Sequence, residues 1–344
     1  MTYDALLVLS FGGPEGPDDV MPFLENVTRG RGVPRERLLE VAEHYQHFGG
    51  VSPINGQVQA LIEALRAELG AHGHTLPVYW GNRNWHPMLE DTVRQMRDDG
   101  VTRALAFATS AYGSYSGCRQ YRDDLARASA AVEGAPGLEK LRPYFDHPGF
   151  IEAQTERVRT ALSTLPEASR GRARLVFTAH SVPVSMARSS PYEAQLRAAS
   201  ALVSKGVGIE GFELVWQSRS GPPQVPWLEP DVGDAIDGFA ADDAGRPIVL
   251  VPIGFTSDHM EVVWDLDHEA EERARAAGVP FVRAGTVGTH PAFVRAVREL
   301  FEERLSDGPR RALTTLSETL GFCSATCCPA PQRPAGPPPG AARP

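Results

Sequence analysis

The chain has 344 residues, of which 42% are hydrophobic and 22% charged, an ordinary composition for a globular protein long enough for two domains. The net charge of −9 argues against a nucleic-acid partner, which would require a basic surface. No apolar stretch approaches the roughly 20 residues of a transmembrane helix. No signal peptide is evident either, so we expect a cytoplasmic protein without a transmembrane segment.

Three short apolar runs in the first half have the character of buried parallel strands, because each one ends in a glycine-rich or polar loop. They cover residues 6–9, 78–80 and 104–107. Helices are predicted between them, one with its apolar face within residues 58–69 and one over residues 87–97. Strands that alternate with helices predict a parallel sheet.

The second half repeats this layout, with strands predicted at residues 175–177, 214–216, 248–253 and 281–283 and a last helix at residues 292–305. The two halves also carry similar segments, WGNR at Trp80 and WQSR at Trp216. We therefore expect two similar α/β domains with a cleft between them. The predicted boundaries are 1–168 and 169–322, followed by a proline-rich, cysteine-containing tail at 323–344.

An acidic segment follows the strand predicted at residues 248–253. A helix is expected to begin near Thr256 and to place five ionisable residues on one face, namely Glu261, Asp265, His268, Glu269 and Glu272. A solvated acidic face is the simpler interpretation. The alternative is a functional face, because open α/β sheets bind ligands at the carboxyl ends of their strands.

One histidine follows a predicted strand in the same half. His180 follows the first strand of that half, and Glu261 follows the third, so both lie at the same edge of one sheet. A histidine and a carboxylate placed together bind a divalent metal or move protons near neutral pH. A histidine with a purely structural role is the competing interpretation.

Arg29 and Arg31 flank Gly30 in a predicted loop. They are either two exposed arginines or an anion site, since the guanidinium group matches the geometry of a carboxylate. Two further polar loops contain Ser52 and Tyr121.

The four cysteines comprise one upstream residue and a group of three near the C-terminus: Cys118, Cys323, Cys327 and Cys328. In a cytoplasmic protein such cysteines are more often reduced, metal-bound or buried than paired as disulfides. Four thiolates hold either zinc or an iron–sulfur cluster, and the spacing alone does not choose between them.

Six motifs occur in order along the chain: LSFGGPEGPDDVMPFLENVTRGRG, GGVSPINGQ, WGNRNWHP, FTAHSVP, WQSRSGPPQVPWLEPD and PIGFTSDHMEVVWDLD. Through these motifs the chain resembles the ferrochelatases, which insert ferrous iron into a porphyrin. It is most similar to the coproporphyrin ferrochelatases of bacteria with high-GC genomes. The resemblance implies a class II chelatase-like fold with two Rossmann-like domains around a porphyrin cleft.

The resemblance also implies roles for individual residues. His180 and Glu261 match the catalytic metal-site pair, and Asp265 and Glu269 continue an acidic stripe that is proposed as a path for metal or protons. Positions that hold or adjoin the porphyrin carboxylates are matched by Ser52, Tyr121, Arg29 and Arg31. Some relatives have a tyrosine that approaches the iron at the position of Phe11, and this contact should be missing here.

The one-plus-three cysteine pattern matches relatives that carry a 2Fe–2S cluster. The implied function is a lyase that converts coproporphyrin III and ferrous iron into coproheme in heme biosynthesis, with transient partners among the enzymes of that pathway. Two alternatives stay open: a protoporphyrin IX ferrochelatase and a tetrapyrrole or metal carrier without turnover. Two α/β domains around a cleft would suit such a carrier as well, because a fold does not define a function.

Overall fold

The computed structural model describes residues 2–306, 309–316 and 326–330, and these form two parallel four-stranded sheets. The first sheet has the order β2-β1-β3-β4 and consists of β1 (Ala5–Ser10), β2 (Val78–Asn82), β3 (Arg103–Ala108) and β4 (Gly137–Lys140). The second has the order β6-β5-β7-β8 and consists of β5 (Arg174–His180), β6 (Glu213–Gln217), β7 (Ile248–Val251) and β8 (Phe281–Arg283). The strand order is the same in both halves, so the predicted pair of similar Rossmann-like units is confirmed.

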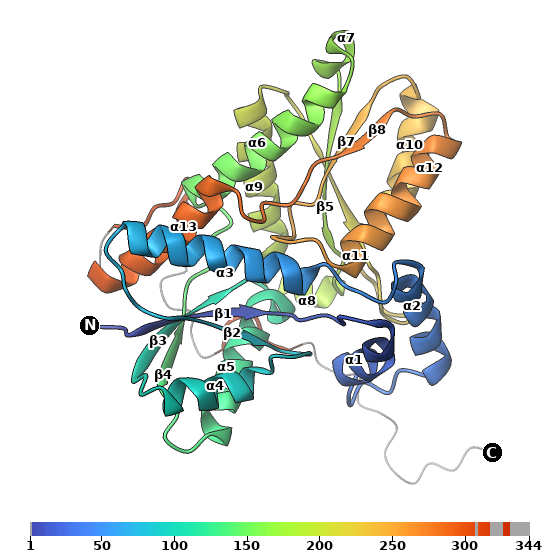
Figure 1. Cartoon of the computed structure of the whole chain (residues 1–344). Coiled ribbons are helices and arrows are strands. Elements are labelled where there is room, and N and C mark those ends of the chain that lie inside the picture. Colours follow the sequence, from blue (N-terminus) through green and yellow to red (C-terminus); the bar gives the residue numbers. More distant parts are fainter. Residues whose placement is uncertain (1, 307–308, 317–325, 331–344) are drawn as a thin grey trace, which may run out of the picture.

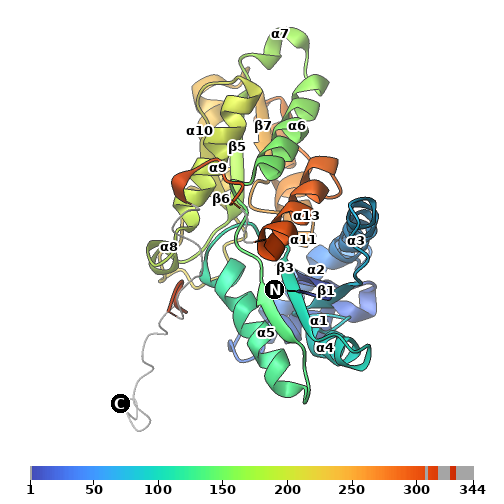
Figure 2. The same ribbon diagram turned by 90° about the vertical axis from the view of Figure 1, so that its left-hand side faces the viewer.

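Helices cover both faces of each sheet, as Figures 1 and 2 show. The first half contains α1 (Val20–Val27), α2 (Arg35–His47), α3 (Ile54–Ala71), α4 (Leu89–Asp98) and α5 (Gln120–Ala131). The helices that follow include α6 (Pro148–Thr164), α9 (Tyr192–Val207), α10 (Val232–Asp243), α12 (Glu271–Ala276) and α13 (Pro291–Ser306). Short elements complete the set: η1 (Pro17–Asp19), η2 (Tyr115–Arg119), α7 (Glu167–Arg170), α8 (Val184–Arg188), α11 (Met260–Val262) and η3 (Val263–Ala270).

The strands were predictable because both of their faces are apolar. Along β1, Leu7 and Leu9 belong to a core cluster with residues of α4 and α5, whereas Leu6 and Val8 pack in the cluster that includes α3. A strand buried on both sides is a continuous apolar run and does not alternate with polar residues. The runs at residues 6–9, 104–107 and 175–177 therefore identify central strands.

Strand β4 was not predicted; its residues Gly137, Leu138, Glu139 and Lys140 form a short edge strand beside β3. These residues are exposed or half-buried, and the segment lacks an apolar run. Its Glu139 carboxylate instead pairs with the guanidinium groups of Arg103 and Arg304. A strand fixed by edge pairing and charge is invisible to a search for hydrophobic pattern.

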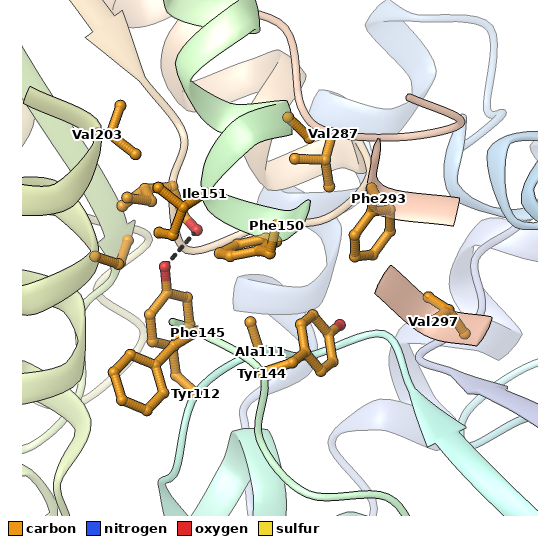
Figure 3. Packing of buried hydrophobic residues seen from close by; sticks show 14 of the residues in the cluster. Ala111, Tyr112, Tyr144, Phe145, Phe150, Ile151, Val203, Val287, Phe293 and Val297 are labelled. Carbon is orange, nitrogen blue, oxygen red and sulfur yellow. Dashed lines mark hydrogen bonds between the residues drawn. The ribbon is translucent and has the colours of Figure 1, made fainter. Parts of the chain in front are cut away.

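One large hydrophobic cluster joins the two sheets. It contains Leu6 and Val8 of the first sheet and Leu175 and Phe177 of the second, with α3, α6, α9 and α13 contributing to it. Figure 3 shows its aromatic centre, where Tyr144 and Phe145 of the first half approach Phe150 of α6 and Phe293 of α13. The two halves therefore share a core.

The loops that leave β3 and β7 are also bonded to each other. The Tyr112 hydroxyl donates a hydrogen bond to the Ile253 carbonyl over 3.0 Å (Figure 3), and the Thr256 hydroxyl donates to the Thr109 carbonyl over 3.0 Å. Both loops follow the carboxyl end of a central strand. The carboxyl edges of the two sheets therefore meet at the junction between the halves.

The domain boundary at residues 168 and 169 stays a prediction. Helix α6 precedes that boundary in sequence but packs against α9, β7 and β8 of the second sheet, and α13 returns to pack on α3 of the first half. Within the described ranges, no helix is both long and apolar enough to cross a membrane.

Replacing Tyr112 by Phe should weaken the connection between the halves. The substitution leaves the buried Ile253 carbonyl without its hydroxyl donor, which costs about 1–3 kcal/mol of unfolding free energy. Tyr144→Phe is the matched control, because the Tyr144 hydroxyl donates to the Ala108 carbonyl within the first half. In urea titrations, Tyr112→Phe should broaden the transition and Tyr144→Phe should lower its midpoint only. Equal, single transitions for both variants would contradict this role of Tyr112.

Candidate active site

His180 and Glu261 lie at the junction of the two halves. His180 is the last residue of β5, and Glu261 lies in α11, which Figure 1 shows close to the first half. The His180 Nε2 atom is 3.8 Å from Glu261 Oε1, and the two side chains are 33% and 47% exposed. The structure thus brings together a histidine and a carboxylate that remain accessible to a ligand.

The ring of His180 has one nitrogen committed to the protein. Its Nδ1 atom lies within hydrogen-bond distance of the Ser181 carbonyl, which only accepts hydrogen bonds, so Nδ1 carries the hydrogen. In the neutral ring this leaves the lone pair on Nε2, the atom that faces Glu261. Such an arrangement is typical of a histidine oriented to bind a metal or accept a proton.

The two groups stabilise each other's charged form. Burial alone would lower the pKa of His180, but the Glu261 carboxylate and the bond to Ser181 raise it to about 9. Burial alone would raise the pKa of Glu261, but His180 lowers it to about 2. Without a metal the pair therefore consists of an imidazolium and a carboxylate at neutral pH. A metal ion that binds to Nε2 has to displace this proton.

The segment that carries the acidic residues is not the continuous α-helix expected from the sequence. It begins as α11, widens into the π-helix η3 with i→i+5 hydrogen bonds, and returns to α-helix in α12. The expected start near Thr256 is also wrong, because α11 begins at Met260. The packing prediction holds for Val262, Leu266 and Ala270, which are buried, whereas Val263 is only half-buried.

Asp265 and Glu269 follow Glu261 at intervals of four residues. Asp265 is half-buried and accepts a hydrogen bond from the Ser218 hydroxyl, and Glu269 is exposed. Burial, with the charges of Glu261 and Glu269, raises the pKa of Asp265 to about 7, although the bond from Ser218 opposes the shift. Asp265 therefore exchanges a proton near neutral pH.

His259 was missed by sequence reasoning although it stands in the SDHMEV segment. Its Nδ1 atom is 3.9 Å from Glu261 Oε2, so Glu261 lies between two imidazoles. Burial lowers the pKa of His259, in contrast to that of His180. The pKa values of the two histidines differ because the Glu261 carboxylate stabilises the charged form of His180 more strongly than that of His259. Only the folded structure reveals this difference.

Ser52 and Tyr121 are both buried in the first half. Ser52 packs on the loop that leaves β1, where its amide donates to the Pro14 carbonyl over 2.9 Å. The Arg83 guanidinium lies 4.7 Å from the centre of the Tyr121 ring and pairs with the Asp124 carboxylate at 2.6 Å. Arg83 was not among the predicted site residues, although its WGNR motif was noted.

Arg29 and Arg31 lie on the surface in the loop that follows α1. Their guanidinium groups form no ion pair with any residue in the described ranges, so both are available to an external anion. Phe11, at the end of β1, is 37% exposed and offers an apolar face near Arg83, whose guanidinium is 6.0 Å from its ring.

A stacked aromatic contact joins α2 to η3. The rings of His44 and Trp264 lie 3.9 Å apart and only 5° from parallel. His47 contacts Trp264 and also His268, whose ring centre is 4.9 Å away. Helix α2 of the first half is thereby packed directly on the helix that carries the acidic residues.

Three of the four cysteines line one pocket of about 380 Å³, namely Cys118, Cys327 and Cys328. Cys323 lies outside the described residues. Burial and the neighbouring thiols raise the pKa of Cys328 to about 12. Among the residues that the structure describes, no three or more His, Cys, Asp or Glu side chains are grouped closely enough to hold a metal ion.

The fold is that of a chelatase. SirB from Bacillus subtilis with Fe³⁺ superimposes with a TM-score of 0.56 at 13% identity, covering 91% of this chain and 100% of SirB. The sirohydrochlorin chelatase SirB from Bacillus subtilis subspecies spizizenii in complex with cobalt gives a TM-score of 0.51 at 13% identity, covering 88% and 97%. This likeness extends to the fold only.

Sequence comparison defines the family. The ferrochelatase family model matches residues 3–305, and the chain belongs to the ferrochelatase family. A protein named coproporphyrin III ferrochelatase from Mycolicibacterium smegmatis is 56% identical over 315 residues, covering 90% of this chain and 92% of the relative. One of the same name from Nocardia farcinica is 55% identical over 352 residues, covering 97% and 98%.

Removing the charge of Glu261 should lower the pKa of His180. In Glu261→Gln the burial of His180 remains while its main ionic partner is lost, so its pKa should fall from about 9 to the ordinary value of about 6.5 or below. NMR titration of the histidine rings in metal-free protein measures this shift. Glu269→Gln is the control and should leave the pKa of His180 in place. An unchanged pKa in Glu261→Gln would disprove the coupling.

Proposed function

We propose that this chain inserts ferrous iron into coproporphyrin III to give coproheme for heme biosynthesis. The observation that carries this proposal is the sequence identity of 55–56% to relatives named coproporphyrin III ferrochelatase, extending over nearly the whole chain. The exposed pair His180 and Glu261 at the edge of the second sheet supports it. Ferrous iron is a substrate here and not a resident cofactor.

His180 and Glu261 are assigned to iron and to the ring protons. Insertion of Fe²⁺ replaces two protons on the porphyrin nitrogens, so the site must bring in a metal and accept protons. Imidazole and carboxylate are suitable ligands for ferrous iron. Because His180 is protonated in the metal-free protein, Nε2 must first release its proton, and it is then a base strong enough to take up a ring proton beside the Glu261 carboxylate.

Asp265 and Glu269 are assigned to a path for iron or protons toward this pair. Their spacing of four residues along η3 supports the assignment, as does the pKa of Asp265 of about 7. A carboxylate that titrates near neutral pH takes up and releases protons readily.

The substrate carboxylates are assigned to the first half of the chain. Arg29 and Arg31 offer exposed cations without a described ionic partner, whereas Ser52 and Tyr121 carry hydroxyl groups that are buried here and are assigned from the resemblance to the family. Coproporphyrin has four carboxylates and protoporphyrin has two. Additional polar and cationic contacts therefore favour coproporphyrin.

An anaerobic assay with purified protein, ferrous iron and either porphyrin tests the function. We expect many turnovers per protein with coproporphyrin III and slower conversion of protoporphyrin IX. Faster turnover of protoporphyrin IX would show that protoporphyrin IX, and not coproporphyrin III, is the substrate. Tight binding of a porphyrin without catalytic metalation would instead identify a carrier.

His180→Ala should reduce metalation by at least about 100-fold, because the variant loses both an iron ligand and a proton acceptor. Porphyrin binding and the circular dichroism spectrum should stay as in the parent protein. His72→Ala is the control, since the His72 side chain is exposed at the C-terminal end of α3. Metalation at the parent rate by His180→Ala would remove His180 from the mechanism.

We also propose that the four cysteines bind a 2Fe–2S cluster. The support is the shared pocket of Cys118, Cys327 and Cys328, with Cys323 only a few residues away in sequence. The tail reaches this pocket through a hydrogen bond of 3.2 Å from the Arg119 guanidinium to the Cys327 carbonyl. Cys328 adopts a left-handed backbone with φ of 46°, a turn that lets two adjacent cysteines serve one site. Thiolates are the ligands of such clusters.

The cluster is tested by the colour of the anaerobically purified protein. We expect visible absorbance typical of 2Fe–2S, and we expect Cys118→Ser to abolish it. Ser189→Ala, which removes a hydroxyl from the same pocket, should retain the colour. A colourless protein with one zinc per chain would show that the cysteines bind zinc and not a cluster. A protein without bound metal would refute the proposed metal site.

Two further expectations rest on the sequence and the assigned reaction. A cytoplasmic location is proposed for this enzyme of heme biosynthesis. Transient contacts with other heme-pathway enzymes suit a product that must be passed on.

A further inference from the structure

Gln217 is a buried polar residue between the strand of His180 and the helix of Glu261. It is the last residue of β6, pairs in register with His180 of β5, and is only 1% exposed. Its carbonyl accepts a hydrogen bond of 2.8 Å from the Ser181 amide.

The side-chain amide of Gln217 connects two elements. Its Oε1 atom accepts a hydrogen bond of 2.9 Å from the Thr178 hydroxyl on β5, and its Nε2 atom donates one of 2.9 Å to the Glu261 carbonyl. The same Nε2 atom lies 3.4 Å from Asp265 Oδ2. One side chain therefore bonds the strand that ends in His180 to the segment that carries both carboxylates.

The orientation of this amide is fixed by its neighbours. The Glu261 carbonyl only accepts hydrogen bonds, so the NH₂ group must face it. The Thr178 hydroxyl then has to donate to the remaining oxygen. Every polar atom of the Gln217 amide is thus used in one arrangement, which is what a rigid buried support requires.

The sheet alone does not position Glu261. Pairing between β5 and β7 ends at Phe177 and Val251, and the chain leaves the sheet before it reaches α11. Gly254 approaches β5 closely, since a Cβ atom there would lie 2.6 Å from that of Ala179, but Gly254 is still seven residues before Glu261. Gln217 contacts the backbone of Glu261 itself.

Ser218 provides a second connection to the same segment. It holds a left-handed backbone with φ of 60°, unusual for a residue other than glycine, and its hydroxyl donates to Asp265 Oδ2. A residue other than glycine keeps this unfavourable backbone conformation only where its contacts hold it there.

We propose that Gln217 is a positioning residue that fixes Glu261 relative to His180 through its bonds to Thr178 and to the Glu261 carbonyl. The proposal rests on the assigned reaction in one respect, namely that His180 and Glu261 handle iron. Porphyrin is assigned to residues of the other half of the chain. Removing the hydrogen bonds of Gln217 should therefore lower kcat/KM for ferrous iron and leave porphyrin binding unchanged.

Steady-state kinetics with each substrate varied in turn test the proposal. Gln217→Met keeps the approximate shape of the side chain and removes its polar atoms, and it should reduce kcat/KM for ferrous iron about 10- to 100-fold. The KM for coproporphyrin III should stay within about twofold of the parent value. Gln154→Met is the matched control, because the Gln154 amide is fully buried without a hydrogen-bond partner in the described structure.

Thr178 gives an independent variant that leaves Gln217 in place. Thr178→Val removes the donor to Oε1 and should reduce kcat/KM for iron about three- to tenfold, whereas Thr178→Ser retains the donor and should restore it. In the Gln217→Met background, Thr178→Val should add nothing, because it acts through Gln217. Additive losses would show that Thr178 acts by another route and would overturn the proposed connection.

A cobalt(II) titration separates failure of this proposal from failure of the assigned function. Co²⁺ binding is measured without porphyrin in the parent protein and in His180→Ala. The binding that is lost in His180→Ala is the binding at the His180 and Glu261 pair. Gln217→Met should weaken this binding about tenfold, even if the protein proves to have no turnover. Parent-like kinetics and parent-like cobalt binding in a folded Gln217→Met variant would refute the positioning role, as would an equal loss in porphyrin binding and melting temperature.

Discussion

The site depends on the bonding between the loops that leave β3 and β7. Tyr112 and Thr109 of one half are tied to Ile253 and Thr256 of the other, so the carboxyl edges of two separate sheets form one surface. Open α/β sheets bind ligands at these edges. When two such edges face each other, a flat ligand can be held by one half while the other half performs chemistry on it. The shared hydrophobic core also joins the two halves.

The second half combines an exposed reactive pair with a buried support. His180 and Glu261 are open to solvent, whereas Thr178 and Gln217 behind them are almost completely buried. This division has a physical reason. Reacting groups must be reached by metal and porphyrin, but their geometry is kept only by hydrogen bonds with which water does not compete. The raised pKa of His180 and the lowered pKa of Glu261 result from the closeness that this support maintains.

Much of the fold was predictable from the sequence, because β1, β3, β5 and β7 are buried on both faces and appear as apolar runs. The edge strand β4 was not predictable, since charge and pairing hold it in place. His180 and Glu261 could be matched because each follows a strand of one sheet. The π-helix could not be predicted from the sequence, because an α-helix and the wider π-helix both place residues four apart on similar faces. Gln217 and His259 were missed because their importance lies in contacts between segments distant in sequence.

The stack of His44 on Trp264 has a mechanical consequence. Helix α2 lies beside the loop that holds Ser52, and Trp264 is three residues beyond Glu261 on the same helical segment. A macrocycle that pushes α2 aside has to slide one ring off the other, and this releases one side of the π-helix. Arrival of the large substrate would then alter the freedom of the carboxylates that face the small one. The order in which the two substrates bind would in that case be set by the contact between α2 and η3, and not by either binding surface alone.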